Sequence, residues 1–287
     1  MTVYFVTGTD TGVGKTIVTA ALAVILRAFG QNVAVIKPVQ TGVRPGEPGD
    51  IDEVRRLAGP VDVREGTRLP DPLAPDRAAL VAGVELPGLH DQRDLVLDAA
   101  TSHDAVIVEG AGGIIVNLGK AFGLLDIARA VREAGQPARW IVVARAGLGT
   151  LNHSSLTVWA IQNRGFSVQG IVIGSWPADP GPAELYNRDD LSLYTGVPVL
   201  GAVPGGASAL LPSDFRARAP DWIRAHWAAP SDSADGPTGP RAGPAGYLNP
   251  AGGSHGCGGG CFAQYLNRPD GAPGLCLPGA EQAGRDL

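Results

Sequence analysis

Short uninterrupted apolar runs alternate along the chain with longer segments whose apolar residues recur at helical spacing. An apolar run without polar alternation predicts a strand buried on both faces, which is typical of parallel sheets covered by helices. We therefore predict an α/β fold of three layers, in which a mostly parallel central sheet is flanked by helices. The strands are expected at residues 3–7, 33–36, 105–108, 140–144, 170–173 and 199–203.

The segments between these runs carry apolar residues three and four apart, which predicts helices that pack one face on the sheet. Gly30 and Gly165 follow two of them, and glycine commonly ends a helix. Ser213 is a candidate N-cap for the last one. Residues 39–42 are expected to form a turn, and residues 59–73 to be rich in turns. The helices are expected at residues 17–28, 51–58, 75–83, 91–101, 124–134, 151–163, 183–194 and 213–227.

The first loop has the composition of a phosphate-binding loop. A predicted strand is followed by GTDTGVGKT at residues 8–16, and a helix begins at once. The glycines let backbone amides approach phosphate oxygens, and the helix N-terminus favours an anion. Lys15 supplies a positive charge, and the Thr16 hydroxyl can bind Mg²⁺. Five residues separate Gly8 from Gly14 where the usual motif has four, so the loop is a longer variant.

The predicted strands end in glycine, a charge or a glycine-rich turn. In a parallel sheet the carboxyl ends of the strands share one edge, and ligands bind there. We therefore expect a P-loop NTPase-like site along that edge. The strand ends are Gly8, Lys37, Glu109, the turn at residues 145–149, Gly174 and Pro204.

The formal net charge of −5 and the lack of a basic run argue against a protein that binds nucleic acid or an anionic membrane. We find no secretory signal before the first strand and no apolar stretch as long as a membrane span. These features predict a cytoplasmic enzyme.

The last part of the chain differs in composition from the rest. Residues 228–287 are rich in Gly, Pro, Ser and Ala and show no apolar period, which predicts a disordered tail after a domain at residues 1–227. All three cysteines, Cys257, Cys261 and Cys276, lie in this segment. Together with His255 they indicate at most a weak metal site.

Four motifs occur in order along the chain: GTDTGVGKT at residues 8–16, KPVQTG at 37–42, EGAGG at 109–113 and GTLNH at 149–153. Together they resemble the dethiobiotin synthetase family over roughly residues 2–227. The longer glycine loop is itself part of that family's pattern. The resemblance implies a P-loop fold and an ATP-dependent ligase of biotin biosynthesis that acts as a homodimer on small molecules.

The resemblance also implies a reaction. Members of the family take 7,8-diaminopelargonate, CO₂ or bicarbonate, and a nucleoside triphosphate with Mg²⁺, and they release a nucleoside diphosphate and phosphate. A carbamate formed on one amine attacks the γ-phosphate, and the second amine then closes the ureido ring of dethiobiotin. ATP is the expected co-substrate, with other nucleoside triphosphates left open, and Mg²⁺ is the expected cofactor.

Carbamate and triphosphate are both anions, so fixed cations must offset their repulsion. The resemblance assigns this catalytic role to Lys15 and Lys37. Judged from position alone, Lys37 could equally be a strand-end lysine that reaches solvent. Thr16, Asp50 and Glu109 match the Mg²⁺ ligands of the family, and all three offer hard oxygen atoms.

Asp50 has two competing interpretations. It precedes a predicted helix with Glu53 three residues later, an arrangement that is typical of a helix cap. Asp52 is also near enough in sequence to bind the metal in its place.

The matched nucleotide-binding positions lie in the glycine loop, at the acidic strand end and at two later strand ends. They are Gly12, Val13, Gly14, Lys15, Thr16, Ile17, Asp50, Glu109, Gly110, Ala111, Gly112, Gly174, Ser175, Pro204, Gly205 and Gly206. Some relatives carry Asn-Asp where this chain has Gly174 and Ser175. Because glycine has no side chain to read a base edge, we expect a loose choice of nucleotide.

The matched substrate-binding positions are Thr11, Lys37, Thr41, Gly149, Thr150, Leu151 and Asn152. Thr11 and Thr41 could equally be turn residues that bond local backbone. Residues 149–152 open a predicted helix, whose N-terminus suits the substrate carboxylate, and in family members they come from the partner subunit. Capping or packing explains His153 better than a role as a base.

Two other functions are weaker alternatives. A related ATP-dependent synthetase of cobalamin-type amidation would add a glutamine-hydrolysing domain with a nucleophilic cysteine, and residues 1–256 contain no cysteine. A nucleotide switch of the ParA or MinD type would carry a lysine at the position of Asp10.

Overall fold

The computed structural model describes residues 1–225 and residue 227, all of which lie in one compact unit. A seven-stranded sheet runs through this part in the order β3-β2-β4-β1-β7-β8-β9, and every neighbouring pair is parallel. The strands are β1 (Thr2–Gly8), β2 (Val33–Thr41), β3 (Asp62–Leu69), β4 (Ala105–Gly113), β7 (Ala138–Ala144), β8 (Val168–Trp176) and β9 (Val199–Pro204).

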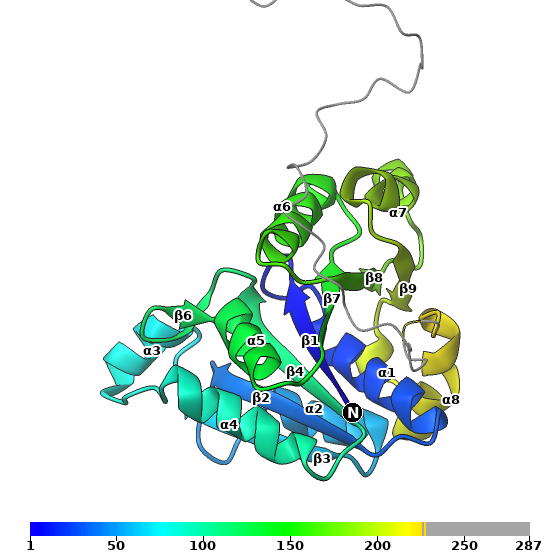
Figure 1. Cartoon of the computed structure of the whole chain (residues 1–287). Helices are drawn as coiled ribbons and strands as arrows, with labels where there is room; N and C mark the ends of the chain where they lie inside the picture. Colours follow the sequence, from blue (N-terminus) through cyan, green and yellow to red (C-terminus); the bar gives the residue numbers. More distant parts are fainter. Residues whose placement is uncertain (226, 228–287) are drawn as a thin grey trace, which may run out of the picture. The chain divides into compact units, whose positions relative to one another are not determined.

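Helices cover both faces of the sheet, as Figure 1 shows, so the predicted three-layer α/β fold is confirmed. One face is covered by α1 (Lys15–Ala28), α2 (Asp50–Ala58) and α8 (Pro212–Trp222). The other face is covered by α3 (Pro75–Ala82), α4 (Leu89–Ala100), α5 (Leu124–Glu133), α6 (Thr150–Asn163) and α7 (Pro182–Thr195).

Two apolar clusters fill the spaces between the sheet and the helices. Phe5 of β1 belongs to one cluster and stacks on Trp140 of β7 at 5.2 Å, whereas its neighbours Tyr4 and Val6 belong to the other. This alternation explains why the strands read as continuous apolar runs, since both of their faces are buried. The packed sheet supplies a rigid edge for the loops at its carboxyl end.

The structure corrects the expectation that residues 59–73 are rich in turns, because β3 occupies most of the first part of this segment. Most positions of this edge strand are only partly buried, and it carries the charged side chains Arg64, Glu65 and Arg68, so it contains no apolar run. Its charges suit an edge strand, which must resist pairing with another chain. A small two-stranded sheet, β5 (Asn117–Gly119) with β6 (Phe122–Gly123), was also not expected.

The expected turn at residues 39–42 is also wrong, because β2 continues to Thr41. Pairing with β4 stops at Ile36, while pairing with β3 continues to Thr41. Pro38 has no N–H to donate, and it lies just beyond the point where β2 and β4 separate. The strand therefore passes through the proline, and the gap that opens beside it receives polar side chains. β4 likewise extends past the predicted residue 108 to Gly113.

Each predicted helix is present, but the last one is shorter than expected. α8 ends at Trp222 instead of residue 227, and Ile223 instead forms an antiparallel bridge with Gly201. Leu211 occupies the cap position, so Ser213 is not the N-cap. The predictions for residues 228–287, including the tail and its weak metal site, lie outside the described residues. In the described part, no helix has both the length and the apolar character needed to cross a membrane.

Candidate active site

The glycine loop joins β1 to α1 at the carboxyl edge of the sheet. Gly12 and Gly14 have φ values of 73° and 97°, in the region that favours glycine. No side chain caps the first turn of α1, and that turn holds no acidic residue. Its backbone amides are therefore left to an anionic ligand. Ile17, a predicted nucleotide contact, packs partly buried against the apolar cluster under α1.

Lys15 is buried at the start of α1, and its Nζ donates to the Asp10 carbonyl oxygen at 3.0 Å. Burial, together with the neighbouring Lys37 charge, lowers its pKa from the usual 10.5 to about 8. The nearby Glu109, Asp50 and Asp10 oppose this shift only in part. An ammonium in this position gains from an added anion, which a phosphate group would supply.

Lys37 lies in the gap between β2 and β4 and is 3% exposed. Its Nζ contacts Asp50 Oδ2 at 2.6 Å and Glu109 Oε1 at 2.8 Å, and it donates to the Gly110 carbonyl oxygen at 3.1 Å. Burial lowers its pKa, but the two carboxylates outweigh that effect and raise it above the usual value. Lys37 is thus a buried, permanently charged group and not a lysine that reaches solvent.

Glu109 connects Lys37 to the glycine loop. It is 2% exposed at the end of the apolar part of β4, and its Oε1 accepts a hydrogen bond from Thr16 Oγ1 at 2.9 Å. The same oxygen faces Lys37. The structure therefore brings together the three predicted metal ligands: Asp50 and Glu109 both contact the Lys37 ammonium, and Thr16 bonds Glu109.

The cap of α2 separates the interpretations of Asp50. Gly49 is the N-cap residue, and its N–H donates to the Asp52 carboxylate at 2.8 Å. The expected cap formed by Asp50 and Glu53 is therefore wrong, because Asp50 is already the first residue of the helix. Asp52 is engaged in the cap and lies 3.5 Å from Arg68, while Asp50 points to Lys37. This geometry favours Asp50 over Asp52 as a ligand in the site.

The predicted nucleoside-binding positions at the ends of β8 and β9, called the nucleoside end below, contact their surroundings mainly through backbone atoms. A Cβ on Gly174 would lie 1.9 Å from the Val13 carbonyl oxygen, and one on Gly14 would lie 2.5 Å from the Gly174 carbonyl oxygen. The Gly205 N–H donates to the Trp176 carbonyl oxygen at 2.6 Å, which brings residues 204–206 against β8 beside Ser175. The two predicted strand ends thus meet, and one of them packs directly on the glycine loop.

Two of the predicted substrate-binding residues, Thr11 and Thr41, lie in the glycine loop and at the end of β2. A Cβ on Gly112 would lie 3.5 Å from Thr11 Oγ1, so the segment with Gly110, Ala111 and Gly112 adjoins the glycine loop. Thr41 ends β2, and its carbonyl oxygen accepts from Gln40 Nε2 at 3.0 Å.

Residues 149–152 start α6 after β7. Gly149 has a φ of 88° and precedes Thr150, Leu151 and Asn152, of which only Asn152 is exposed. Within the described residues, the polar contacts of Lys37 come from β4 and α2 and none comes from this segment. His153 Nδ1 is buried and has no hydrogen-bond partner among the described residues. Within one subunit, the N-terminus of α6 therefore does not contribute to the cluster around Lys37.

Comparison with known proteins identifies the family of this chain. A family model described as an AAA domain matches residues 2–208. The ATP-dependent dethiobiotin synthetase BioD of Rhodococcus jostii is 50% identical over 228 residues, which are 79% of this chain and 96% of that protein. The protein of the same name from Streptomyces avermitilis is 49% identical over 223 residues, 78% of this chain and 92% of that protein. This chain belongs to the ATP-dependent dethiobiotin synthetase family.

Membership of the dethiobiotin synthetase family confirms the resemblance read from the four motifs, and it does not favour the amidation synthetase or the nucleotide switch. Among solved structures, a ParA family ATPase from Chlorobium tepidum gives a TM-score of 0.49 at 15% identity, over 76% of this chain and 92% of that chain. The assignment of the fold therefore rests on the order of the strands in this chain.

Two polar residues that lie near the site of this synthetase were assigned no role from the sequence. Gln40 is 4% exposed and bonds the first amide of α2, although it was expected in a turn. Arg145 forms an ion pair with Asp10 of the glycine loop. The hydrogen bond from the Thr11 N–H, and then the Arg145 charge, lower the pKa of Asp10. The sequence signal for Gln40 was its place in the KPVQTG motif at residues 37–42, to which only Lys37 and Thr41 were assigned roles.

Proposed function

We propose that this chain is an ATP-dependent dethiobiotin synthetase, which joins CO₂ to 7,8-diaminopelargonate and closes the ureido ring while ATP is split to ADP and phosphate. The observation that carries the proposal is the buried Lys37 held between Asp50 and Glu109 beside the glycine loop. A fixed, dry cation at this position suits a reaction between two anions. Identity of 50% to a named synthetase supports the same function.

The mechanism follows from the placement of the two lysines. One amine adds to CO₂ and loses a proton, and a carbamate oxygen then attacks the γ-phosphorus as the bond to ADP breaks. Lys15 would bind the outer phosphates, while Lys37 would contact carbamate and phosphoryl oxygens together. The second amine attacks the carbamoyl carbon and loses a proton, and phosphate leaves with the electron pair of the C–O bond. The lysines stabilise charge in the transition state and transfer no group themselves.

The family implies Mg²⁺, and the oxygen atoms beside Lys37 fit it. Mg²⁺ prefers oxygen ligands and is usually bound by one or two carboxylates together with substrate phosphates. We propose that Thr16, Asp50 and Glu109 would hold it, and that it would neutralise phosphate charge when bound. In residues 1–225 and 227, no group of three or more His, Cys, Asp or Glu residues is arranged to bind a metal by itself.

Two helix N-termini support the proposed binding of a triphosphate and a carboxylate. Among the eight described α-helices, α1 and α6 have no acidic residue in the first turn, whereas each of the other six has at least one. Both begin after a glycine with positive φ, Gly14 and Gly149. An acidic side chain at either end would repel an anionic ligand. We infer that α1 receives the triphosphate and α6 the substrate carboxylate.

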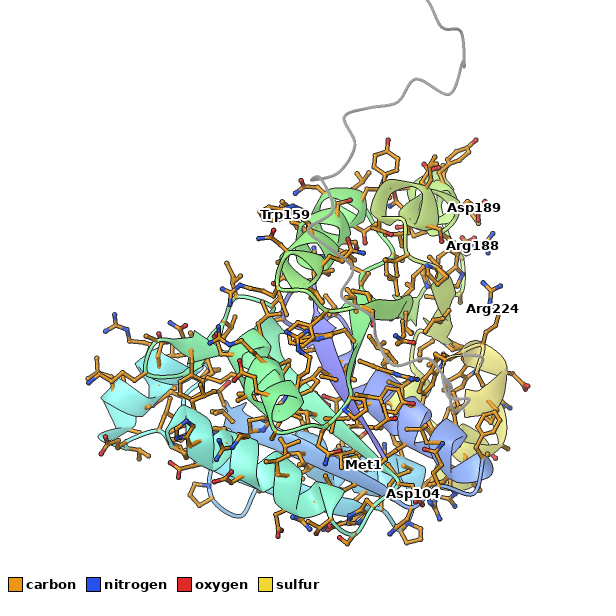
Figure 2. All side chains as sticks on the ribbon, viewed as in Figure 1. Met1, Asp104, Trp159, Arg188, Asp189 and Arg224 are labelled. Atoms are coloured by element: carbon orange, nitrogen blue, oxygen red, sulfur yellow. The ribbon has the colours of Figure 1, made fainter. Side chains whose placement is uncertain are left out.

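We also propose a homodimer in which α6 of the partner subunit completes each site. The support is an apolar surface on α6 and the turn before it, where Leu148, Leu156 and Trp159 are 81%, 55% and 42% exposed. Figure 2 shows Trp159 on the outer side of α6. Such a surface is typical of an interface. The cytoplasmic location and the domain at residues 1–227 stay predictions.

Mixed dimers test the shared site. Lys37→Ala removes the catalytic cation, and Asn152→Asp places a negative charge at the start of α6, so each variant alone is expected to lose activity. If the two residues act in one site across the dimer, mixing the variants creates one site free of both changes, and activity returns. A fully active monomer in sedimentation under assay conditions, or a mixture no more active than its parts, contradicts the shared site.

Product formation tests the proposed function. The full chain is incubated with Mg-ATP, bicarbonate and 7,8-diaminopelargonate, and dethiobiotin is measured by mass spectrometry together with released phosphate. We expect equal amounts of dethiobiotin and phosphate, and phosphate release that requires the diamine. Phosphate release that is independent of the diamine, with no dethiobiotin formed, would overturn the proposal.

A further inference from the structure

Gln40 lies close to the proposed site and has no role in the mechanism above. It is 4% exposed, near the end of β2. Its Oε1 accepts the Asp50 N–H at 2.9 Å, and its Nε2 donates to the Thr41 carbonyl oxygen at 3.0 Å. The amide is thus oriented by one donor and one acceptor, so its oxygen is directed at α2.

The contact with Asp50 holds the residue that touches Lys37. The first amides of a helix have no partner inside the helix, and Gln40 supplies one for the first residue of α2. The side chain of the same residue reaches Lys37 at 2.6 Å. Asp50 is therefore held through its backbone by Gln40 and through its carboxylate by Lys37, and both of these residues come from β2.

The proline in β2 explains how Lys37 and Gln40 reach the same residue. Residues three apart in a regular strand point to opposite faces. Here Ile36 and Val39, also three apart, pack in the same apolar cluster. The alternation therefore shifts by one residue between them, at Pro38, and the residue after each of them, Lys37 and Gln40, contacts Asp50.

We propose that Gln40 is a positioning residue that fixes the Asp50 carboxylate against Lys37 and beside the Glu109 carboxylate. This inference rests on the proposed function, because it assigns Gln40 to the same phosphoryl-transfer site. Loss of its hydrogen bond would leave α2 folded, since the Gly49 N–H keeps its bond to Asp52 and Arg68 still faces Asp52. The expected result is a displaced carboxylate in an otherwise intact protein.

A matched pair of glutamines provides the test. Gln40→Met keeps the length of the side chain and removes both polar atoms. Gln92→Met is the control, because Gln92 is 1% exposed on α4 and donates to the Pro38 carbonyl oxygen of the same strand at 3.4 Å, but forms no hydrogen bond to the side chains of Lys37, Asp50 or Glu109. We expect Gln40→Met to lower kcat and to weaken Mg²⁺ activation by roughly tenfold to a hundredfold, as for other groups that orient metal ligands. Gln92→Met should change neither.

A double variant separates positioning from a general loss of stability. If Gln40 acts through Asp50, then Gln40→Met combined with Asp50→Asn should be no slower than Asp50→Asn alone. Independent losses that multiply would overturn the inference. An equal fall in kcat for Gln92→Met and Gln40→Met would overturn it as well.

Hydrogen exchange provides a measurement that does not depend on turnover. In Gln40→Met, a peptide covering residues 49–58 should exchange faster than in the unmodified chain, while peptides of the other helices should not. Unchanged exchange there would overturn the inference. If Gln40→Met proves too unstable to assay, Gln40→Glu is used instead, because it retains an oxygen that can accept the Asp50 N–H. Residues 49–58 of that variant should exchange as slowly as in the unmodified chain. Fast exchange of this peptide in both variants would overturn the inference.

The two proposals fail in different ways. Absence of dethiobiotin from the unmodified chain would reject the proposed function. Mg-ATP binding and hydrogen exchange of Gln40→Met would still decide whether Gln40 orders the start of α2. If instead the unmodified chain makes dethiobiotin and Gln40→Met matches it in kcat and Mg²⁺ activation, only the role of Gln40 is rejected.

Discussion

The two ends of the proposed nucleotide site are built in opposite ways. At the phosphate end, charged side chains are buried and hold one another, as in Lys37 with Asp50 and Glu109. At the nucleoside end, Gly14 and Gly174 meet backbone to backbone with no room for a side chain. The first arrangement fixes charge where phosphoryl transfer would occur. The second supports a close fit of the loop and offers little to distinguish one base from another.

The few lysines of the chain are concentrated at the phosphate end of the proposed site. The sequence has 23 Lys and Arg residues, and only Lys15, Lys37 and Lys120 are lysines. Two of the three lie buried at the phosphate end, whereas Lys120 is exposed. All the others among these 23 residues are arginines. A compact ammonium is thus used where a point charge must fit between carboxylates and phosphates.

The largest effect is expected at the phosphate end, for Lys37→Ala. The lysine contact would be strongest in the transition state, so kcat should fall by on the order of a hundredfold or more. Binding of Mg-ATP should persist, because the glycine loop, Lys15 and Thr16 are unchanged. Steady-state kinetics and calorimetric ATP titration measure the two effects.

Two variants serve as controls for this prediction. Lys120→Ala removes an exposed lysine and should leave kcat unchanged. Lys15→Ala should weaken ATP binding as well as lower kcat, because Lys15 belongs to the loop itself. A Lys37→Ala enzyme that turns over at nearly the normal kcat would show that the buried cation is structural only, and the proposed mechanism would be wrong.

A smaller effect is expected at the nucleoside end, for Gly174→Ala. The added Cβ would lie 1.9 Å from the Val13 carbonyl oxygen, so the glycine loop must move. Forcing a group into a packed place costs roughly 1–3 kcal/mol, which corresponds to a rise of about fivefold to a hundredfold in the KM for ATP if the cost falls on nucleotide binding. The KM should change more than kcat, in contrast to Lys37→Ala.

Gly88→Ala is the matched control for this substitution. Gly88 has an extended backbone, and a Cβ there would lie 3.4 Å from its nearest neighbour, Asp91 Oδ2. ATP kinetics should therefore stay normal in that variant. If Gly174→Ala also leaves the KM for ATP unchanged, the backbone contact between β8 and the glycine loop does not shape the nucleotide site.

The sequence predicted the fold well where apolar runs are buried on both faces. It failed at β3, because an edge strand with Arg64, Glu65 and Arg68 has no apolar run. It also ended β2 too early, because Pro38 is normally a strand breaker, and the parting of β2 from β4 that accommodates it depends on tertiary structure.

The candidate site could be predicted only as far as its motifs. Lys37 and Glu109 were found because each directly follows an apolar run that predicts a strand, although β2 and β4 both continue beyond them. The choice between Asp50 and Asp52 required the cap of α2, where Asp52 bonds the Gly49 N–H. Gln40 could not be found, since alternation along a regular strand would direct it away from Lys37. Sequence patterns show which residues share an edge, but side-chain contacts across it depend on local irregularities.

A still smaller effect is expected when the nucleotide is changed. At matched concentrations of ATP, GTP and CTP, turnover should differ by less than roughly a hundredfold, because larger discrimination needs directed hydrogen bonds to the base. Gly174 offers backbone alone for such bonds. Competition assays with the three nucleotides measure the ratio directly. A stronger preference for ATP would mean that another residue reads the base.

The smallest effect is expected from truncation of the chain after Ala228. The proposed domain ends at residue 227, and Trp227 is 3% exposed and packs edge-on against Tyr4 at 5.3 Å. The truncated chain keeps this contact, so its Tm and kcat should match those of the full chain. Trp227→Ala in the truncated chain should instead cost about 3 kcal/mol or more, as for other large buried side chains. Thermal unfolding distinguishes the two, and a large loss on truncation alone would show that residues beyond Ala228 belong to the domain.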